Sequence, residues 1–389
     1  MSPTDRIYLD HQATTPVDRR VVEAMLPAFT ELYGNAASRD HVFGLEAKRA
    51  VDTAREHVAA LIGAEPSEII FTSGATEADN LAVLGVLEQH RDRGDHLVTV
   101  KTEHKAVLDA AAEAERRGFS VTTLDVDSTG LVDPDDVARA ITSRTTLVSV
   151  MAANNEIGTL APLAEVGRVC AERDVLFHTD AVQLAGHLPL DVRAAGVHLV
   201  SLSAHKMYGP KGVGALYRRR SMPRVELHPI LFGGGHERGL RSGTLNVPGI
   251  VGFGEAARIA KREMNALAIQ HKAWTDRLLA GLRDRVGEVR LNGHPTDRLP
   301  HNLNVSVPGV ESRALVVELN ASVALATGSA CTSASVEPSH VIEALGFGPD
   351  RAHHAVRLSV GRANTVGQMD QAVDRIAAAV EALRAFSVF

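Results

Sequence analysis

Three side chains that could take part in chemistry lie at or just beyond the ends of short apolar, β-branched runs. They are Lys206, Asp180 and His104, which follow the runs 199–203, 175–179 and 97–100. A lysine amine can bond covalently to an aldehyde, and imidazole exchanges protons near neutral pH. A carboxylate next to apolar residues is costly to bury without a cationic partner. A histidine in such a place is more often a packing or surface residue, so none of the three is decisive alone.

A fourth feature, residues 73–78, could bind an anion. Gly74 lets the backbone turn tightly, and Thr76 supplies a hydroxyl where a helix is expected to begin. Free amides and the helix dipole attract anions at such a terminus. The same pattern would also serve as an ordinary helix cap. The paired Asn154 and Asn155 leave a similar choice open, because asparagines in a loop are usually turn formers.

The two cysteines differ in their surroundings. Cys331 is preceded by Gly328-Ser329-Ala330 and followed by Thr332-Ser333, which are small or polar residues. A structural cysteine is normally surrounded by apolar residues, so Cys331 is predicted to be a reactive thiol. Cys170 follows Leu163, Val166 and Val169 at helical spacing and is predicted to be a packing residue.

Strands and helices alternate over the region 45–220, which predicts a mostly parallel sheet covered on both faces. The expected strands are 69–72, 97–100, 121–124, 147–151, 175–179 and 199–203, and the expected helices are 45–63, 77–89, 106–117 and 163–172. In such sheets ligands bind at the carboxyl ends of the strands. The anion site, the acid, the lysine and the histidine should therefore converge there. Together they match the needs of pyridoxal phosphate: a phosphate cup, a carboxylate for the pyridine nitrogen and an amine for the aldehyde.

The pattern changes after residue 255. A long helical stretch, 256–282, leads into a shorter α/β region that ends in a helix over 369–383. We therefore predict a large cofactor-binding domain over 15–255. A smaller domain is predicted from 1–14, whose residues 7–9 would add a strand, together with 256–389, and it carries the Cys331 loop at about 324–337.

Composition narrows the class of protein. The chain has 389 residues, 41 basic against 47 acidic residues and a net charge of -6. This balance argues against direct nucleic-acid binding, and no metal site is predicted. Two cysteines exclude a disulfide framework, and neither a signal peptide nor a membrane span is expected. The cytoplasm is the predicted location.

At this point the sequence resembles the cysteine desulfurases of the NifS/IscS group, which are fold-type-I pyridoxal-phosphate enzymes. The resemblance extends from residue 8 to about 365 and rests on motifs that occur in order: Ala13-Thr14-Thr15-Pro16, residues 71–77, Lys101-Thr102-Glu103-His104, residues 154–158, Ser203-Ala204-His205-Lys206, Gly233-Gly234-Gly235-His236-Glu237, Arg241-Ser242-Gly243-Thr244 and residues 328–333. It implies an aspartate-aminotransferase-like large domain with a mostly parallel seven-stranded sheet, and a smaller α/β domain.

The resemblance also implies a role for each matching residue around the ring. Lys206 would bond to the cofactor aldehyde and act as the base at the substrate α-carbon. Asp180 would face the pyridine nitrogen and Gln183 the ring hydroxyl. His104 would stack on the ring and handle the proton of the substrate thiol.

Further matches concern the phosphate and the substrate. The implied phosphate contacts are Ala75, Thr76, Ser203 and His205, with Thr244 given by the other subunit of a homodimer. Asn155, also near the cofactor, and Arg357 would hold the substrate carboxylate, for which a guanidinium fork is well suited.

The implied reaction converts L-cysteine to L-alanine and leaves the sulfur as a persulfide on Cys331. The Gly- and Ser-containing loop would let Cys331 move between the cofactor and an acceptor. The implied acceptor is an iron–sulfur scaffold or an enzyme of tRNA thiolation or DNA phosphorothioation. Two alternatives stay open: another enzyme of the same fold, such as an aminotransferase or a selenocysteine lyase, and a non-catalytic sulfur-relay scaffold.

One departure from the group is visible near the start of the chain. The group usually has tyrosine followed by serine or asparagine where this chain has His11 and Gln12. These residues either alter the substrate entrance or repack a turn, and we favour the second interpretation.

Overall fold

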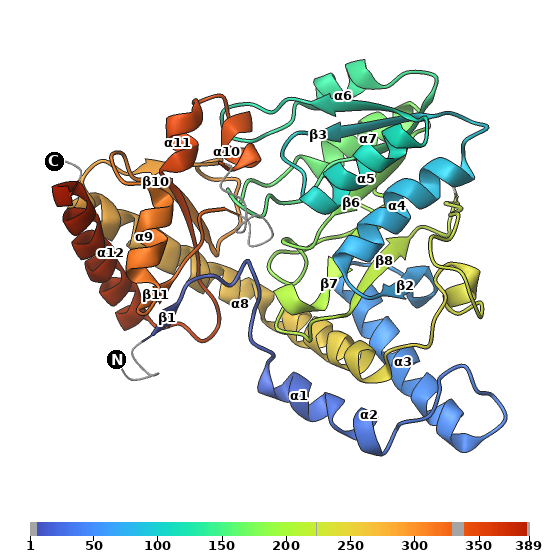
Figure 1. Ribbon diagram of the computed structural model, residues 1–389. Helices are drawn as coiled ribbons and strands as arrows, with labels where there is room; N and C mark the ends of the chain where they lie inside the picture. The colour runs from blue at the N-terminus through green and yellow to red at the C-terminus, as the bar shows by residue number, and fades with distance from the viewer. Residues whose placement is uncertain (1–5, 223, 329–337, 387–389) are drawn as a thin grey trace.

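The computed structural model describes residues 6–222, 224–328 and 338–386 (Figure 1). Its central sheet has seven strands in the order β2-β8-β7-β6-β5-β3-β4. They are β2 (Ile69–Thr72), β3 (His96–Val100), β4 (Ser120–Leu124), β5 (Thr145–Ser149), β6 (Leu176–Asp180), β7 (Leu199–Ser203) and β8 (Gly214–Arg218). β8 pairs antiparallel with β2 and β7, and the other pairs are parallel. The predicted mostly parallel seven-stranded sheet is confirmed.

Side chains of each strand alternate between two hydrophobic cores, as the pleat of a strand requires. Ile69 and Phe71 point into one core and Ile70 into the other. The first core is covered by α3 (Val42–Leu61), α6 (Pro134–Ala140), α7 (Leu163–Glu172) and the N-terminal part of α8 (Val247–Val286). The second is covered by α4 (Ala75–Gln89) and α5 (Lys105–Arg116). The sheet is therefore the middle layer of three.

A third core lies beside this unit (Figure 1). Its sheet has the order β12-β10-β9, and β1 pairs in parallel with β11. Its elements are β1 (Ile7–Tyr8), β9 (Arg290–Leu291), β10 (Asn302–Ser306), α9 (Ser312–Leu319), β11 (Val323–Ala324), β12 (Ala355–Ser359) and α12 (Val366–Phe386). The predicted N-terminal strand is thus confirmed, and the chain returns from its first residues to its last third.

The helix α8 connects the two units. It has 40 residues and contributes Ile250 and Phe253 to the first core but Trp274 and Leu278 to the third. At 1.5 Å per residue this is about 60 Å of continuous helix. It begins earlier than predicted because Asn246 caps it, accepting from the amide of Gly249. The predicted domain boundary falls within α8, and the division into domains stays a prediction.

The remaining helices are short. They are α1 (Arg19–Met25), α2 (Pro27–Thr30), α10 (His340–Ala344) and α11 (Pro349–His353), with 3-10 turns at Pro66–Glu68, Ala204–Lys206 and Glu237–Gly239. In the described part of the chain, none of the helices is long and apolar enough to span a membrane.

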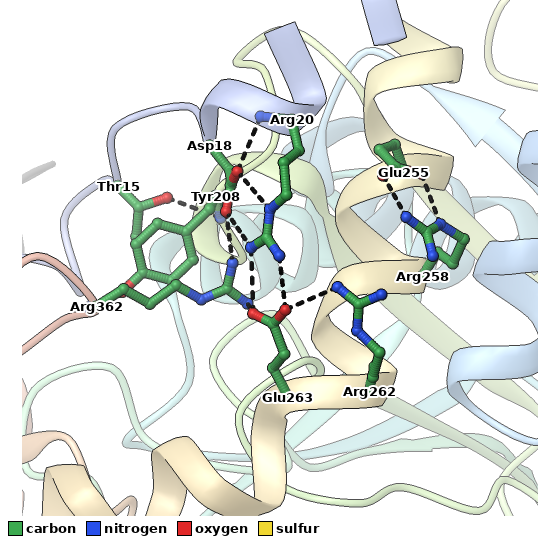
Figure 2. A network of polar contacts seen from close by, with 9 residues as sticks. All are labelled: Thr15, Asp18, Arg20, Tyr208, Glu255, Arg258, Arg262, Glu263 and Arg362. Atoms are coloured by element: carbon green, nitrogen blue, oxygen red, sulfur yellow. Dashed lines mark hydrogen bonds and ion pairs between the residues drawn. The ribbon is translucent and has the colours of Figure 1, made fainter. Parts of the chain in front are cut away.

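Charged side chains tie three distant segments together (Figure 2). Arg20 in α1 donates to Asp18 and to Glu263 of α8, at 2.7 Å in each case. Arg362, which follows β12, pairs with the same two acids, and its guanidinium lies 4.4 Å from the ring centre of Tyr208. This network joins the N-terminal segment, α8 and the loop after β12 next to the Lys206 turn.

Candidate functional site

A cavity of about 440 Å³ lies at the carboxyl ends of the central strands. Ten of the predicted site residues line it: Ala75, Thr76, His104, Asn155, Asp180, Gln183, Ser203, His205, Lys206 and Arg357. Convergence at this edge was expected from the alternation of strands and helices, because parallel strands end on the same side of the sheet.

One end of the cavity is the N-terminus of α4. Gly74 is its cap and, having no side chain, leaves the amides of the first turn without a side-chain cap within the described chain. Those amides, with the dipole of a 15-residue helix, form an anion site. A Cβ at Gly214 would lie 2.7 Å from the carbonyl carbon of Gly74, so glycine there lets β8 pass close to this turn. Lys211 and His205 line the same cavity and add basic groups.

The opposite wall carries Asp180, the last residue of β6. Its side chain is buried and accepts from the amide of Val182 at 2.9 Å. Burial raises the pKa of Asp180, while the nearby His104 and Lys206 act in the opposite direction. A carboxylate in this environment is stabilised by a cation. A protonated pyridine nitrogen would supply one.

Asp79 lies behind this wall, and one ligand atom each of Asp79, His104 and Asp180 lie within 4.8 Å of one another. Two carboxylates and an imidazole could hold a divalent ion. His104 and Asp180 also line the cavity.

Lys206 closes the 3-10 turn that follows β7. Its amine donates to the carbonyls of Gln12 and, at 2.9 Å, of Ala13. The hydroxyl of Thr15 donates to the carbonyl of His205 and accepts from the amide of Tyr208, both at 2.9 Å. The N-terminal segment therefore packs against the turn that contains Lys206, and its carbonyls hold the Lys206 amine at the cavity.

Gln12 is part of the cavity wall. The amide of Gln183 donates to its carbonyl at 3.2 Å, and Asn302 donates to its side-chain oxygen at 2.6 Å. Repacking of a turn, the interpretation favoured from the sequence, therefore does not account for Gln12. The departure from the group pattern lies on the cavity wall.

Arg357 extends from β12 and is 1% exposed. It donates to the carbonyl of Asn155 and to a carboxylate oxygen of Asp10, both at 2.7 Å. Its Nε and the side-chain oxygen of Asn155 have no hydrogen-bond partner among the described residues. Arg357 and Asn155 therefore each have a buried polar atom beside the cavity that is available for a ligand.

His104 caps α5, where its Nδ1 accepts from the amide of Ala106 at 3.1 Å. In a neutral ring the proton then lies on Nε2. The imidazole is fixed by its helix and lines the cavity.

These residues fit pyridoxal phosphate: an open helix N-terminus for the phosphate, a buried acid for the ring nitrogen and an amine between them. Comparison with known proteins leads to the same group. The family model described as aminotransferase class-V matches residues 7–372. The chain belongs to this family.

Within it, the chain is a cysteine desulfurase that uses pyridoxal phosphate. It is 54% identical over 381 residues to the cysteine desulfurase IscS of Anaeromyxobacter sp. (strain Fw109-5), covering 98% of this chain and 94% of that one. The IscS of Histophilus somni (strain 129Pt) is 52% identical over 383 residues, with the same coverage. A solved NifS-like protein superposes with a TM-score of 0.90 at 37% identity, covering 97% of this chain and 99% of the other. The crystal structure of DndA from Streptomyces lividans has a TM-score of 0.78 at 40% identity, covering 90% and 99%.

Two predicted site residues of the desulfurase are not placed at the cavity. Thr244 is exposed and is not among the described residues that line it. Cys331 lies outside the described residues. Cys170 is buried in α7, where burial raises the pKa of its thiol to about 12, and its prediction as a packing residue is confirmed.

Sequence reasoning assigned no role to four residues that line the cavity of the desulfurase: Thr14, Met151, Val182 and Lys211. Lys211 had a signal, since it follows Lys206 by five residues in the same turn region. Thr14 had none, because its place depends on a strand that pairs with residues more than 300 positions away.

Proposed function

We propose that this cysteine desulfurase removes sulfur from L-cysteine, holds it as a persulfide on Cys331 and passes it to an acceptor. The observation that carries the proposal is the convergence of Lys206, Asp180 and the N-terminus of α4 on one cavity. Pyridoxal phosphate, when bound, withdraws electrons from the substrate α-carbon.

The chain's own residues would supply the proton steps. The Lys206 amine would bond to the aldehyde and, once displaced by the substrate amine, take the α-proton. Asp180 would keep the ring nitrogen protonated. His104, with its proton on Nε2, would handle the proton of the substrate thiol.

Arg357 and Asn155 would orient the substrate through its carboxylate. The Nε–H of Arg357, which has no hydrogen-bond partner among the described residues, supports this placement, since buried polar atoms are normally hydrogen-bonded. Asn155 would donate to the substrate carboxylate through its side-chain NH2 group. Asp10 already neutralises part of the guanidinium charge, so the substrate carboxylate would share this cation.

The sulfur step would belong to Cys331. Its thiolate would attack the substrate sulfur. The new S–S bond forms as the bond between sulfur and the substrate β-carbon breaks, and the electron pair stays with carbon, which is protonated to give alanine. The persulfide is the form in which sulfur leaves the cavity.

A homodimer is part of the proposal, with Thr244 contributed to the partner's phosphate site. Large apolar side chains are exposed on the segment from α1 to the start of α3: Leu26, Phe29, Tyr33, Val42 and Phe43. Such a grouping is typical of a protein interface. We expect the chain to elute as a dimer, and Phe29→Asp to yield monomers.

The acceptor would be an iron–sulfur scaffold or an enzyme of tRNA thiolation or DNA phosphorothioation, and the cytoplasm is the proposed location. Transfer of labelled sulfur from the persulfidated enzyme would identify the acceptor. The catalytic assignment is tested by borohydride reduction of the holoenzyme followed by peptide mapping. We expect the cofactor on Lys206; reduction onto another residue, or onto none, would contradict the proposal.

A further inference from the structure

Four histidines from separate parts of the chain gather in the interior beside the Lys206 turn. His11 follows β1, His187 lies in the loop after β6, His271 lies within α8, and His301 comes just before β10. Their exposed fractions are 4%, 9%, 2% and 1%. We call them the histidine cluster.

Three rings of the cluster contact one another. His187 and His301 are stacked with ring centres 4.0 Å apart, and His271 lies edge-on to His301 at 6.2 Å. Stacked rings cannot direct their nitrogens to a common ion. Trp274, the only tryptophan in the chain, lies 5.8 Å from His271.

One member of the cluster is bonded to the lysine turn. The Nε2 of His187 lies 2.9 Å from the backbone carbonyl oxygen of Lys206. A carbonyl only accepts hydrogen bonds, so Nε2 carries the proton and donates. This bond fixes the orientation of the peptide unit that follows the Lys206 α-carbon, and with it the direction of the side chain.

We propose that His187 is a positioning residue for Lys206, and that the stacked and edge-on rings of the cluster hold its imidazole in place. The proposal rests on Lys206 being the residue that binds the cofactor. It assigns a role to His11 as well, since that ring packs against Gly361, where an added Cβ would lie 2.4 Å from it. The cluster thereby joins the N-terminal turn, α8 and the loop after β12 to the lysine.

The packing of the cluster requires uncharged rings. Three cations face it from different elements: Lys206 from its turn, Arg357 from β12 and Arg362 from the following loop. Arg362 is itself held by Asp18 and Glu263 (Figure 2), so these acids do not neutralise the histidines.

The remaining groups near the cluster are neutral. Tyr8 lies edge-on to His11 at 4.8 Å, and Tyr208 lies 6.2 Å from the same ring. Burial lowers the pKa of His11 and of His187 to about 4, and that of His271 to about 3. At neutral pH the cluster is therefore uncharged.

The test follows cofactor binding rather than turnover. Apoenzyme is mixed with pyridoxal phosphate, and the growth of the visible band of the lysine-bound cofactor is timed. We expect His187→Ala to slow this step about tenfold, because a misdirected amine loses its near-attack geometry. His187→Gln keeps an N–H donor and should remain within about threefold of wild type.

His198→Ala is the matched control. His198 is also buried and accepts from the amide of Phe177 at 3.1 Å, but it immediately precedes β7, at the opposite end of that strand from the lysine turn. We expect it to lower stability without slowing the appearance of the band. Equal slowing by His187→Ala and His198→Ala, or wild-type speed in His187→Ala, would overturn the proposal.

A second measurement applies if His187→Ala does not fold. A protonated imidazole quenches a neighbouring indole, so Trp274 emission in the wild-type apoenzyme reports the charge on His271. We expect constant emission from about pH 8 to about pH 5, whereas a step near the unperturbed value of about 6.5 would overturn the uncharged cluster. Failure of the catalytic proposal is recognised separately, because borohydride would then not fix the cofactor to wild-type Lys206.

Discussion

At the residue scale, the two cysteines of the chain make a matched pair for testing the sulfur step. We expect Cys331→Ser to abolish alanine formation with a physiological acceptor, because no thiolate remains to attack the substrate sulfur. Cys170→Ser should retain activity and lose some stability, since it buries a hydroxyl in α7. Alanine and persulfide are measured for both variants. Alanine formation by Cys331→Ser at the wild-type rate would favour an aminotransferase or lyase without a sulfur-carrying residue.

Arg357 allows a second prediction at this scale. Arg357→Lys keeps the charge but loses the fork that donates to both Asn155 and Asp10. We expect the KM for cysteine to rise by about tenfold or more with a smaller change in kcat, because bidentate geometry is lost. Steady-state kinetics separate the two constants. A fall in kcat alone would place Arg357 outside substrate binding.

Single residues were predictable where one local feature decides their place. Lys206, Asp180 and His104 follow strands directly, so the strand pattern located them at the cavity. The histidine cluster could not be predicted, because its members come from four segments far apart in the sequence. No local periodicity carries that information.

At the element scale, a buried ion pair supports the strand that leads to the anion site. Arg55 of α3 and Glu237 form a bidentate pair at 2.7 Å, and Glu237 also accepts from the amide of Phe71 in β2. The glycine-rich motif 233–237, quoted from the sequence without a structural role, thus brings an acid under β2. This contact holds the strand whose end becomes the N-terminus of α4.

Arg55→Met should therefore be costly. It leaves Glu237 buried without its cation, which typically costs about 3 kcal/mol or more. Lys272→Met breaks the exposed pair with Asp276 and is the matched control, with an expected cost below about 0.5 kcal/mol. Urea unfolding of the apoenzyme compares the two. Similar losses in both variants would mean that the buried pair does not support β2.

Element bounds were well predicted where hydrophobic periodicity is strong, as for α7, whose predicted and observed limits coincide. β8 was missed, since its run Gly-Ala-Leu-Tyr-Arg begins with a glycine and ends in a basic run. It is antiparallel to both neighbours and so falls outside the strand–helix alternation on which the prediction rested.

At the scale of the whole molecule, two sets of titratable groups determine how the free energy of unfolding changes as the pH falls. Burial holds the pKa of His11, His187 and His198 at about 4. Hydrogen bonds from Arg20 hold the pKa of Asp18 and of Glu263 at about 2. The unfolded chain takes up protons at ordinary pKa values, so it binds more protons than the folded chain as the pH falls. Stability should decline first between about pH 6.5 and 4, through the histidines, and then between about pH 4 and 2, through the network of Figure 2.

Three buried carboxyls act against the first loss of stability, the one caused by the histidines. The pKa values of Asp79, Glu103 and Asp180 are raised by burial, so the folded chain takes up protons there that the unfolded chain does not. The variant His301→Asn isolates the contribution of the histidines to the pH dependence of stability. It removes one imidazole whose pKa burial holds well below its usual value. Between about pH 7 and 5.5, this variant should lose about 1 kcal/mol less stability than wild type. His228→Asn, at an exposed histidine, should follow the wild-type curve. If urea unfolding showed His301→Asn and wild type losing the same stability between the two pH values, the buried His301 would not be one of the groups that couple this fold to acid.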